Sequence, residues 1–469
     1  MPGTGIANPD KADSSGVQLH YPQARWLDLV EEQFGVAVAD PYRWLENDVR
    51  QDNEVRDWVN AENAVTEAYL ATLPGREILQ KRMTALFDHD RYGTPRKAGT
   101  HYFYTYNSGL QNQSPLYVRD GLKGKQQLVL DPNGLSPDGA TALAEWEPSP
   151  DGRYLLYAVQ DGGTDWRILH IIDVESGQVL PDEIRWVKFS GLAWDGDSKG
   201  FFYSRFDAPA DGKTFQSTNL NQKVYYHRLG TPQDSDRLIY ATPGHPQMGH
   251  NAQVSDDGKW LLITSSQGTD ERYELTLSDL SNPVRKPWKL VRGLNHDWRL
   301  IGNVGAQFYF LTDKGASRLR VVTLDAEHPR ARPVEIVPER SETLVGGSMV
   351  GDKIILAYLH DAKTVAEMIH LDGTPAGDVP IPGIGTAAGF GGKGGDPETF
   401  FAFSGFTTPT TIYRFDTATG ETSLFAQSKV DFDPANYVTQ QIFYPSKDGT
   451  QVPMFLIRRA DVAQSGKPA

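Results

Sequence analysis

The sequence predicts a mainly β fold, a seven-bladed β-propeller, and two observations lead to it. The first is an Asp-Gly turn followed by a short apolar run, seen at residues 149–159 and again at 254–264. Asp-Gly supplies the positive φ angles of a tight turn, and apolar runs of this length are typical of buried strands. The second is that related units recur. Seven copies align on Tyr104, Tyr157, Tyr203, Ile263, Phe310, Ala357 and Phe403.

The spacing of these copies matches the period of a propeller blade. The steps between the aligned positions are 53, 46, 60, 47, 47 and 46 residues, and a period of about 50 residues is known from propeller repeats. A second apolar run follows each copy by about ten residues, as at 169–174, and a polar turn comes next. The pattern therefore predicts four antiparallel strands in each repeat. A β-sandwich would not require seven regular copies.

Composition narrows the classes of function. The chain has 469 residues and a formal net charge of −14, which argues against a basic groove for nucleic acid. No run approaches the roughly 20 apolar residues of a membrane span, and the first twenty residues hold no apolar signal core. We therefore expect no nucleic-acid or membrane partner, and both cytoplasm and periplasm stay open as locations. The absence of cysteine rules out disulfides, a thiol nucleophile and cysteine-based zinc sites.

The segment before the repeats is predicted to be partly helical. Residues 1–20 have little apolar content and are predicted to be disordered. Asp40, followed by Pro41, is a candidate helix N-cap. Helices are predicted at 54–70, where apolar residues follow a helical period, and at 76–87. From about residue 91 the apolar pattern changes to the period of two that strands require.

The pattern changes again after the last repeat. Residues 436–444 and 452–457 are predicted strands joined by Lys447-Asp448-Gly449, which is a hairpin signal. A lone hairpin is not stable by itself, so we expect it to belong to a larger domain. The predicted organisation is a propeller at residues 79–435 between two flanking parts, 1–78 and 436–469.

Two short motifs resemble catalytic or cofactor signatures, and neither has the required context. Gly196-Asp197-Ser198-Lys199-Gly200 has the spacing of a nucleophile elbow, but a predicted strand follows Ser198 where that motif needs a helix. Residues 383–388 resemble a dinucleotide fingerprint without its crossover helix, and more glycines follow at 389–395. We interpret Ser198 as a turn residue and 383–395 as a loop, and we expect no cofactor.

The eleven histidines are scattered along the sequence. His245 and His250 lie on a predicted loop, and His89 lies between two aspartates, but no third ligand stands at a metal-binding spacing. We interpret them as surface histidines and expect no metal. The residues alone thus indicate a propeller without a catalytic centre. A propeller that binds a protein or glycan partner without catalysis is compatible with them.

Motifs at both ends and in the middle of the chain resemble the prolyl oligopeptidase family. They are Tyr21-Pro22, Asp40-Pro41-Tyr42-Arg43-Trp44-Leu45-Glu46, Asp165-Trp166, Val187-Lys188-Phe189-Ser190, and the hairpin that begins Gln441-Ile442-Phe443-Tyr444. The resemblance implies a serine endopeptidase that hydrolyses short proline-containing peptides after proline. It also implies that the propeller is inserted into an α/β-hydrolase domain, gates access to the active site, and has residues 1–78 and 436–469 as parts of that domain on either side.

The resemblance also implies roles for individual residues. The family's catalytic Ser, Asp and His would follow Ala469, so no catalytic residue is expected in this chain, which alone is expected to be inactive. Its partner is then the remaining hydrolase half. Phe189, Met248 and Thr269 correspond to the substrate-binding pocket, and Asp165 to an acid that forms a salt bridge with an arginine of the hydrolase domain. The alternatives are that Phe189 and Met248 belong to the blade core and that Asp165 is a turn residue.

Overall fold

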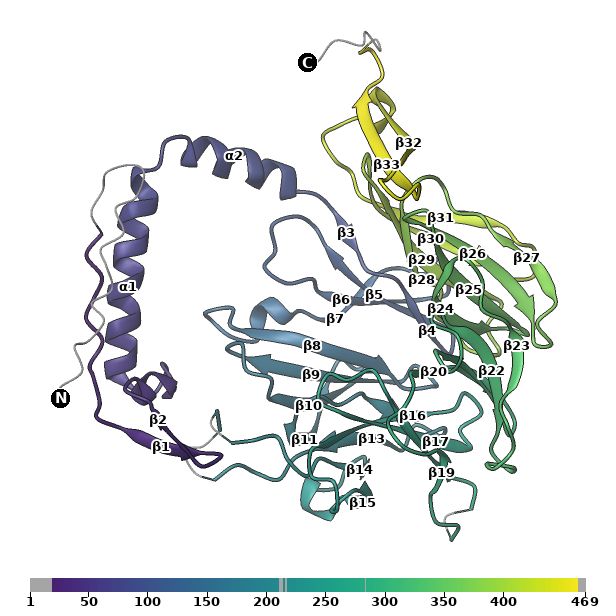
Figure 1. Ribbon diagram of the computed structural model, residues 1–469, viewed down its shortest axis with the longest axis horizontal. Coiled ribbons are helices and arrows are strands. Elements are labelled where there is room, and N and C mark those ends of the chain that lie inside the picture. The colour runs from purple at the N-terminus through teal and green to yellow at the C-terminus, as the bar shows by residue number, and fades with distance from the viewer. Residues whose placement is uncertain (1–18, 211–213, 216, 283, 463–469) are drawn as a thin grey trace. The chain divides into compact units, whose positions relative to one another are not determined.

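The computed structural model describes residues 19–210, 214, 215, 217–282 and 284–462 (Figure 1). The predicted disorder of residues 1–20 therefore falls almost wholly outside the described residues. The chain divides into two compact units. Unit 1 holds the residues up to Ala85 together with Pro209–Thr218, and unit 2 holds Leu86–Ala208 and the residues from Asn219 onward.

Unit 1 is a small hairpin followed by helices. Its elements are β1 (Val30–Gln33), β2 (Val36–Ala39), the 3-10 helix η1 (Arg43–Glu46), α1 (Asn53–Thr72) and most of α2 (Arg76–Phe87). Asp52 caps α1, because its carboxylate accepts hydrogen bonds from the backbone N–H groups of Glu54 (2.8 Å) and Val55 (3.2 Å). Both predicted helices are confirmed.

The predicted role of Asp40 as an N-cap is wrong. Its carboxylate binds the guanidinium group of Arg43 instead, and the residue that precedes η1 is Tyr42, which makes no capping hydrogen bond through its side chain. The Arg43 side chain also reaches Glu31 on β1 at 2.5 Å. A charged partner within three residues thus takes the carboxylate that a backbone N–H would otherwise use.

Unit 2 consists of antiparallel sheets that follow one another along the chain. The first sheet contains β3 (Arg91–Tyr92), β4 (Arg96–Ala98), β5 (His101–Asn107), β6 (Leu116–Asp120) and β7 (Gln127–Leu130). An eight-stranded sheet comes next, with β8 (Thr141–Pro148), β9 (Tyr154–Asp161), β10 (Arg167–Asp173), β11 (Val179–Val187), β12 (Ala193–Trp194), β13 (Gly200–Arg205), β14 (Lys223–Arg228) and β15 (Arg237–Ala241).

Four sheets of four strands and a final hairpin complete unit 2. Two of these sheets are β16 (Met248–Val254), β17 (Trp260–Gln267), β18 (Glu274–Asp279) and β19 (Trp288–Val291), and β20 (Trp298–Val304), β21 (Gln307–Thr312), β22 (Arg320–Asp325) and β23 (Val334–Val337). The other two are β24 (Thr343–Val350), β25 (Lys353–His360), β26 (Lys363–His370) and β27 (Pro375–Val379), and β28 (Thr386–Gly389), β29 (Glu398–Gly405), β30 (Thr408–Asp416) and β31 (Thr422–Gln427). The hairpin is β32 (Tyr437–Pro445) and β33 (Gln451–Arg459), as predicted.

The mainly β propeller fold is confirmed, but the prediction of seven separate blades is wrong. Five sheets have the size of a single blade, and the sixth has eight strands. Each aligned repeat position lies on a strand, and the second and third repeats share the eight-stranded sheet through one pair, Val187 with Arg205. The strand β12 has only two residues. It therefore leaves part of the edge of β13 open, and β11 pairs there.

The repeated turn has the same hydrogen bonds in two copies. The Ser149 hydroxyl donates to the Asp151 carboxylate (2.6 Å) and accepts from the backbone N–H of Tyr154 (2.9 Å). Ser255, Asp257 and Trp260 repeat this arrangement. Short polar side chains that bond to nearby backbone are what favours turns at such positions. The serine is thus part of the repeat signature along with the Asp-Gly pair.

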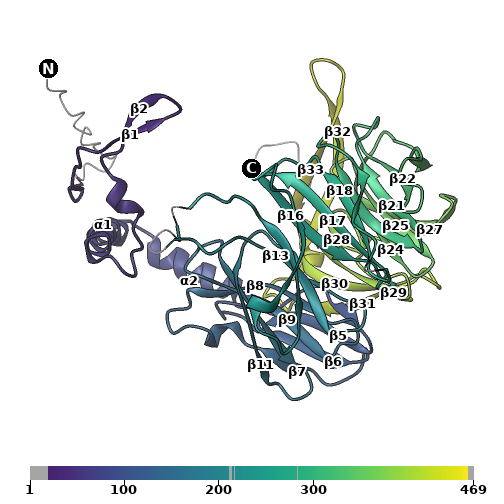
Figure 2. The same ribbon diagram turned by 90° about the horizontal axis from the view of Figure 1, so that it is seen from below.

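The first and last of these sheets pack against each other. Tyr102 on β5 meets Phe400 on β29 edge to face, with ring centroids 5.8 Å apart, and its hydroxyl donates to the buried carboxylate of Glu398. Lys97 and Asp396 form an ion pair of 3.1 Å at the same junction. Figure 2 shows strands of the first sheet, β5 and β6, beside β29, β30 and β31 of the last. Contacts between side chains join these two sheets. Among the described residues, no strand belongs to both of them.

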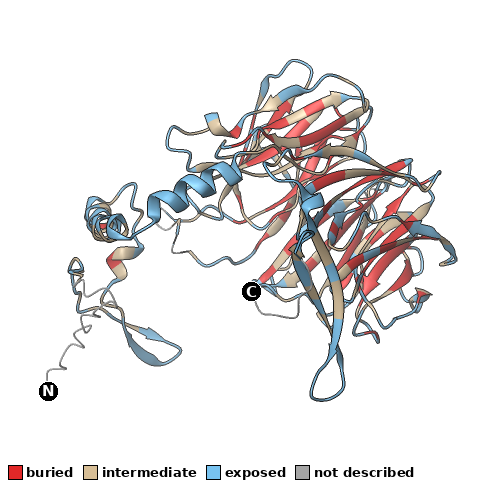
Figure 3. Cartoon of the chain, turned by 90° about the horizontal axis from the view of Figure 1, so that it is seen from above, coloured by how far each residue is buried: buried red, intermediate tan, exposed pale blue. Residues whose placement is uncertain are grey.

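Buried residues concentrate in the strands of the sheets, as Figure 3 shows. Large aromatic and aliphatic side chains fill the space between successive sheets, for example Trp260, Leu275, Phe308 and Phe310. The helices differ: α1 buries Val55 alone among its described side chains, and α2 buries none. Five apolar residues of α2 are exposed, namely Ile78, Leu79, Met83, Leu86 and Phe87. None of the helices in the described part of the chain has the length and apolar character needed to cross a membrane.

Candidate functional site

A pocket with a volume of about 700 Å³ opens where the third, fourth and fifth repeats meet. Its walls come from the segments after β11 and β13, the segment before β14, the strand β16, the second half of β17 with the segment after it, and the first residues of β20. Phe189, Met248 and Thr269 all line it. The structure thus brings together three predicted site residues that span 80 positions of the sequence. Asp165 does not line the pocket.

Phe189 follows β11 and is not part of the blade core. Its side chain is 58% exposed, and its backbone has a φ of +53°, in the left-handed region that non-glycine residues rarely adopt. The ammonium group of Lys188 lies 5.4 Å from the Phe189 ring centroid and 4.9 Å from that of Trp166. Both distances fit cation–π contacts. An exposed aromatic ring at a pocket rim is therefore available to a ligand.

Met248 and Thr269 differ in exposure. Met248 is the first residue of β16 and is 9% exposed, whereas Thr269 is an exposed residue of the turn after β17. A methionine side chain is flexible and polarisable, so it adapts to apolar groups of different shape. Together with Phe189 these side chains give the pocket an apolar wall with a hydroxyl at its edge.

Asp165 lies in the turn between β9 and β10, next to the same lysine. Its carboxylate is 3.9 Å from the Lys188 ammonium group, and its side chain is 58% exposed. Lys188 thus lies between Asp165 and the Phe189 ring. The carboxylate keeps most of its surface open to solvent, so its ion pair within the chain is weak.

His250 is buried in the pocket wall, which contradicts its interpretation as a surface histidine. Its Nδ1 lies 2.8 Å from the Ser265 hydroxyl and its Nε2 lies 3.1 Å from the Thr242 hydroxyl. Burial, assisted by Lys289, lowers the pKa of His250 to about 4. The ring is neutral at neutral pH. Alternation along β16 would have predicted this burial, because Met248, His250 and Ala252 share the buried face.

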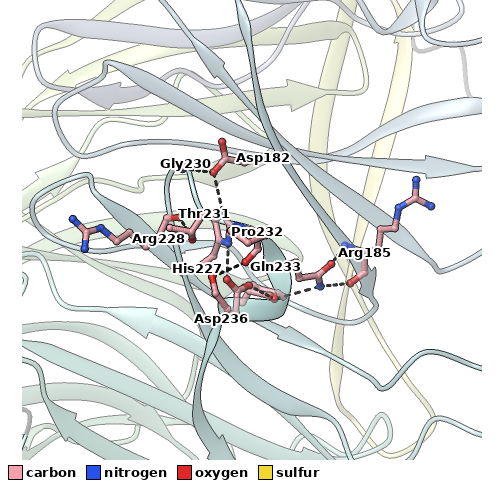
Figure 4. Close-up of polar contacts among 11 residues, drawn as sticks. Asp182, Arg185, His227, Arg228, Gly230, Thr231, Pro232, Gln233 and Asp236 are labelled. Carbon is pink, nitrogen blue, oxygen red and sulfur yellow. Dashed lines mark hydrogen bonds and ion pairs between the residues drawn. The ribbon is translucent and has the colours of Figure 1, made fainter.

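A second histidine, His227, also contradicts the interpretation as a surface residue. It is fully buried on β14, with Nδ1 2.7 Å from the Asp236 carboxylate and Nε2 3.0 Å from that of Asp182 (Figure 4). The Asp182 oxygen that faces Nε2 also accepts from the Gly230 N–H (2.6 Å). Because both ring nitrogens face carboxylate oxygens, both donate hydrogen bonds when His227 is protonated, and we assign it as an imidazolium between two carboxylates.

The electrostatics of His227 agree with that assignment. Burial lowers its pKa, but the hydrogen bonds and charges of Asp236 and Asp182 outweigh burial, so the pKa is raised. The guanidinium groups of Arg185 and Arg228 point away from the cluster in Figure 4. We call Asp182, His227 and Asp236 the buried ion triplet. It does not line the pocket.

The motifs that resembled catalytic or cofactor signatures lie in turns and at the start of strands. Ser198 is buried, has a φ of +59°, and precedes the strand β13, so its interpretation as a turn residue is confirmed. The interpretation of 383–395 as a loop is wrong in part, because Thr386–Gly389 form the strand β28, where a dinucleotide fingerprint needs a helix. Neither motif lines the pocket.

The described residues contain groups for binding and no arrangement for acyl transfer. Among these residues no histidine is hydrogen-bonded to both a serine and a carboxylate, the order that nucleophilic catalysis by serine requires; Ser341 and His360 both bond the Glu342 carboxylate instead. No group of three or more His, Cys, Asp and Glu side chains among them is placed to hold a metal ion. The pocket offers an apolar wall, backbone groups, amide and hydroxyl side chains, and the side chain of Arg299.

Comparisons with known proteins agree with this fold. Residues 22–428 match the family model described as the prolyl oligopeptidase N-terminal β-propeller domain. The prolyl endopeptidase of Elizabethkingia meningoseptica is 34% identical over 457 residues, which are 97% of this chain and 64% of that protein. That of Elizabethkingia miricola is 33% identical over 450 residues, 96% of this chain and 63% of the relative. The chain thus spans about 64% of the length of these curated relatives.

Solved structures show the same likeness. One from a study of two prolyl endopeptidases and their inter-domain dynamics is 44% identical, with a TM-score of 0.74, covering 94% of this chain and 64% of that one. Prolyl oligopeptidase B of Galerina marginata, bound to a 25-residue macrocyclization substrate, is 28% identical with a TM-score of 0.81, covering 94% and 66%. The family model covers all seven aligned repeat positions and the pocket. The chain therefore belongs to the prolyl oligopeptidase family, of which it contains the N-terminal propeller domain.

Proposed function

We propose that this chain is the propeller part of a serine endopeptidase that hydrolyses short peptides on the C-terminal side of proline. The observation that carries the proposal is the meeting of Phe189, Met248 and Thr269 in one pocket. The resemblance assigns all three to substrate binding, although they lie far apart in the sequence. The names of the relatives, prolyl endopeptidase and prolyl oligopeptidase, support the reaction.

The proposal includes the domain organisation. Residues 79–435 form the propeller, and it is inserted into an α/β-hydrolase domain to which residues 1–78 and 436–469 belong. The separate sheet of β32 and β33 supports this division, since no blade strand pairs with it. The exposed apolar face of α2, which crosses the boundary between the two parts, supports a covering hydrolase domain as well, because an apolar helix face in water is normally covered by another element.

The pocket receives the residues that precede the proline. Phe189 and Met248 offer apolar contact to them, while the hydrolase domain holds the proline itself. Asp165 pairs with a substrate-binding arginine of that domain, and its exposed carboxylate supports this role because it is weakly held by Lys188. The propeller thus controls which peptides reach the reacting groups and which side chains are favoured.

The test is kcat/KM of the full product of the gene that encodes this chain, with and without Phe189→Ala. A phenylalanine buries at least about 150 Å² when covered, and roughly half of the Phe189 ring is free to contact a ligand. At about 25 cal/mol per Å², a partial cover gives about 1–2 kcal/mol. We expect a loss of about 5- to 30-fold, larger for peptides with a bulky residue two or three places before proline.

Phe34 provides a matched control. It is also an exposed phenylalanine with a φ of +53°, and it lies in the turn between β1 and β2. Phe34→Ala should leave kcat/KM and substrate preference unchanged. A wild-type gene product that does not cleave proline peptides would overturn the proposed function and favour a propeller that binds a partner without catalysis. A Phe189→Ala variant that loses activity equally on every substrate would overturn the pocket assignment.

A further inference from the structure

The side chain of Gln222 connects the two halves of the pocket wall. It is 2% exposed and lies just before β14. Its amide nitrogen donates to the carbonyl oxygens of Lys188 (2.8 Å) and Phe189 (3.2 Å), and its amide oxygen accepts from the backbone N–H of His250 (2.5 Å). One glutamine thus ties the segment that carries Phe189 to the strand that carries Met248.

The Phe189 segment needs such a tie. A left-handed backbone at a residue with a β-carbon is unfavourable and persists only where the surroundings hold it. Phe189 is also exposed, so packing of its side chain does not hold it. The rest of the segment has anchors of its own, because the N–H of Gly191 donates to Asn251 (2.9 Å) and Ser190 accepts from the N–H of Ser204 (2.7 Å). Gln222 supplies the hydrogen bonds at residues 188 and 189.

We infer that Gln222 is a positioning residue that sets the distance and orientation between Phe189 and Met248, and thereby the preference of the pocket for apolar residues before proline. The inference rests on the proposed function. The Gln222 amide makes three hydrogen bonds to the backbone of two chain segments. In any other conformation these buried groups would lose their hydrogen bonds and would not regain them from water, which costs free energy. The amide therefore defines one arrangement of the wall.

The test compares Gln222→Met and Gln222→Glu with the wild-type gene product. Methionine has a similar shape and none of the hydrogen bonds. Glutamate keeps an acceptor for the His250 N–H but has no donor for the two carbonyl groups. We expect both variants to lower kcat/KM by about 5- to 30-fold for peptides with a bulky residue before proline, mainly by raising KM. For short peptides without such a residue, kcat/KM should stay within about twofold of the wild-type value. That split is a readout that a general loss of stability would not produce.

Gln233 provides the matched control. Its side chain also bridges to a distant backbone, accepting from the N–H of Arg185 (3.1 Å) and donating to its carbonyl oxygen (3.0 Å), but it does not line the pocket. Gln233→Met should lower the melting temperature at most, with no change in substrate preference. If Gln233→Met and Gln222→Met change preference alike, the positioning role is refuted.

A double variant separates this inference from the proposed function. If Gln222 acts through Phe189, Gln222→Met should cause no further loss of preference when Phe189→Ala is already present. A full additional loss in that background would overturn the inference, and so would an unchanged preference in Gln222→Met alone while Phe189→Ala changes it. Unchanged preference in Phe189→Ala would instead refute the proposed pocket itself.

Discussion

Replacing His227 with leucine should destabilise the propeller strongly, because it removes the cation of the buried ion triplet. Leucine has about the volume of the imidazole ring and no hydrogen-bond donor. The carboxylates of Asp182 and Asp236 would then stay in the interior without the charge that offsets theirs. Asp236 would keep the Tyr203 hydroxyl (2.7 Å) and Asp182 the Gly230 N–H (2.6 Å). Neither donor carries a positive charge.

The expected magnitude follows from the burial of all three side chains. Their exposed fractions are 0% for His227, 1% for Asp182 and 0% for Asp236. Removing one partner of a buried ion pair costs about 3–5 kcal/mol in the free energy of unfolding. His227→Gln keeps one donor for one carboxylate, so it should cost less, about 1.5–3 kcal/mol for the lost charged hydrogen bond. The two variants therefore predict a graded loss.

The pH dependence has a definite sign. A raised pKa means that the folded protein binds the proton more tightly than the unfolded chain, so protonation of His227 favours folding. This stabilisation is fully present below the unfolded pKa of 6.5 and is lost as the pH rises through the folded value. The difference in stability between wild type and His227→Leu should therefore shrink as the pH rises above 6.5 and through the folded pKa.

The assay is urea unfolding followed by tryptophan fluorescence at several pH values. His328→Leu is the control, because His328 also pairs with one carboxylate, Asp325 at 2.8 Å, but on the surface. Solvent and salt screen such a pair, so its loss should leave the midpoint close to that of wild type. A His227→Leu variant as stable as His328→Leu, or a difference that grows as the pH rises, would refute the imidazolium assignment.

Two further predictions concern other buried polar groups. His250→Gln should remove acid sensitivity, because the lowered pKa of about 4 means that protonation opposes folding. Wild type should therefore lose stability relative to His250→Gln as the pH falls from about 6.5 toward 4. A difference in urea midpoint between the two proteins that is the same at pH 7 and pH 5 would contradict this. Tyr102→Phe should cost about 1.5–3 kcal/mol, because it removes a hydrogen bond to the buried Glu398 carboxylate between the first and last sheets. An unfolding free energy equal to that of Tyr444→Phe, an exposed control, would show that the bond does not stabilise this junction.

The sequence predicted the local elements well because their signals are local. Turn chemistry and apolar periodicity placed a strand at each repeat, and helical spacing placed α1 and α2. Two predictions were wrong because a sequence pattern does not show which partner a side chain or a strand finds. Asp40 binds Arg43 instead of capping a helix, and the two-residue β12 allows β11 to pair with β13.

The candidate site was only partly accessible to sequence reasoning. Phe189, Met248 and Thr269 were selected by resemblance, and no spacing between them indicates a shared pocket. Gln222 was not found at all, because a glutamine before a strand has no distinctive pattern. Its function depends on which carbonyl groups lie within reach of its amide, and that is a property of the folded chain.

The mainly β character of the repeats and the positions of the two helices follow from the sequence alone, since backbone propensity and side-chain alternation act over a few residues. Three features appear only in the folded chain: which repeats share a sheet, the position of His227 between Asp182 and Asp236, and the link that Gln222 makes between the segments of Phe189 and Met248. The physical reason is that hydrogen bonds and ion pairs require distances near 3 Å. Residues separated by tens of positions reach such distances only after the strands between them have paired and packed.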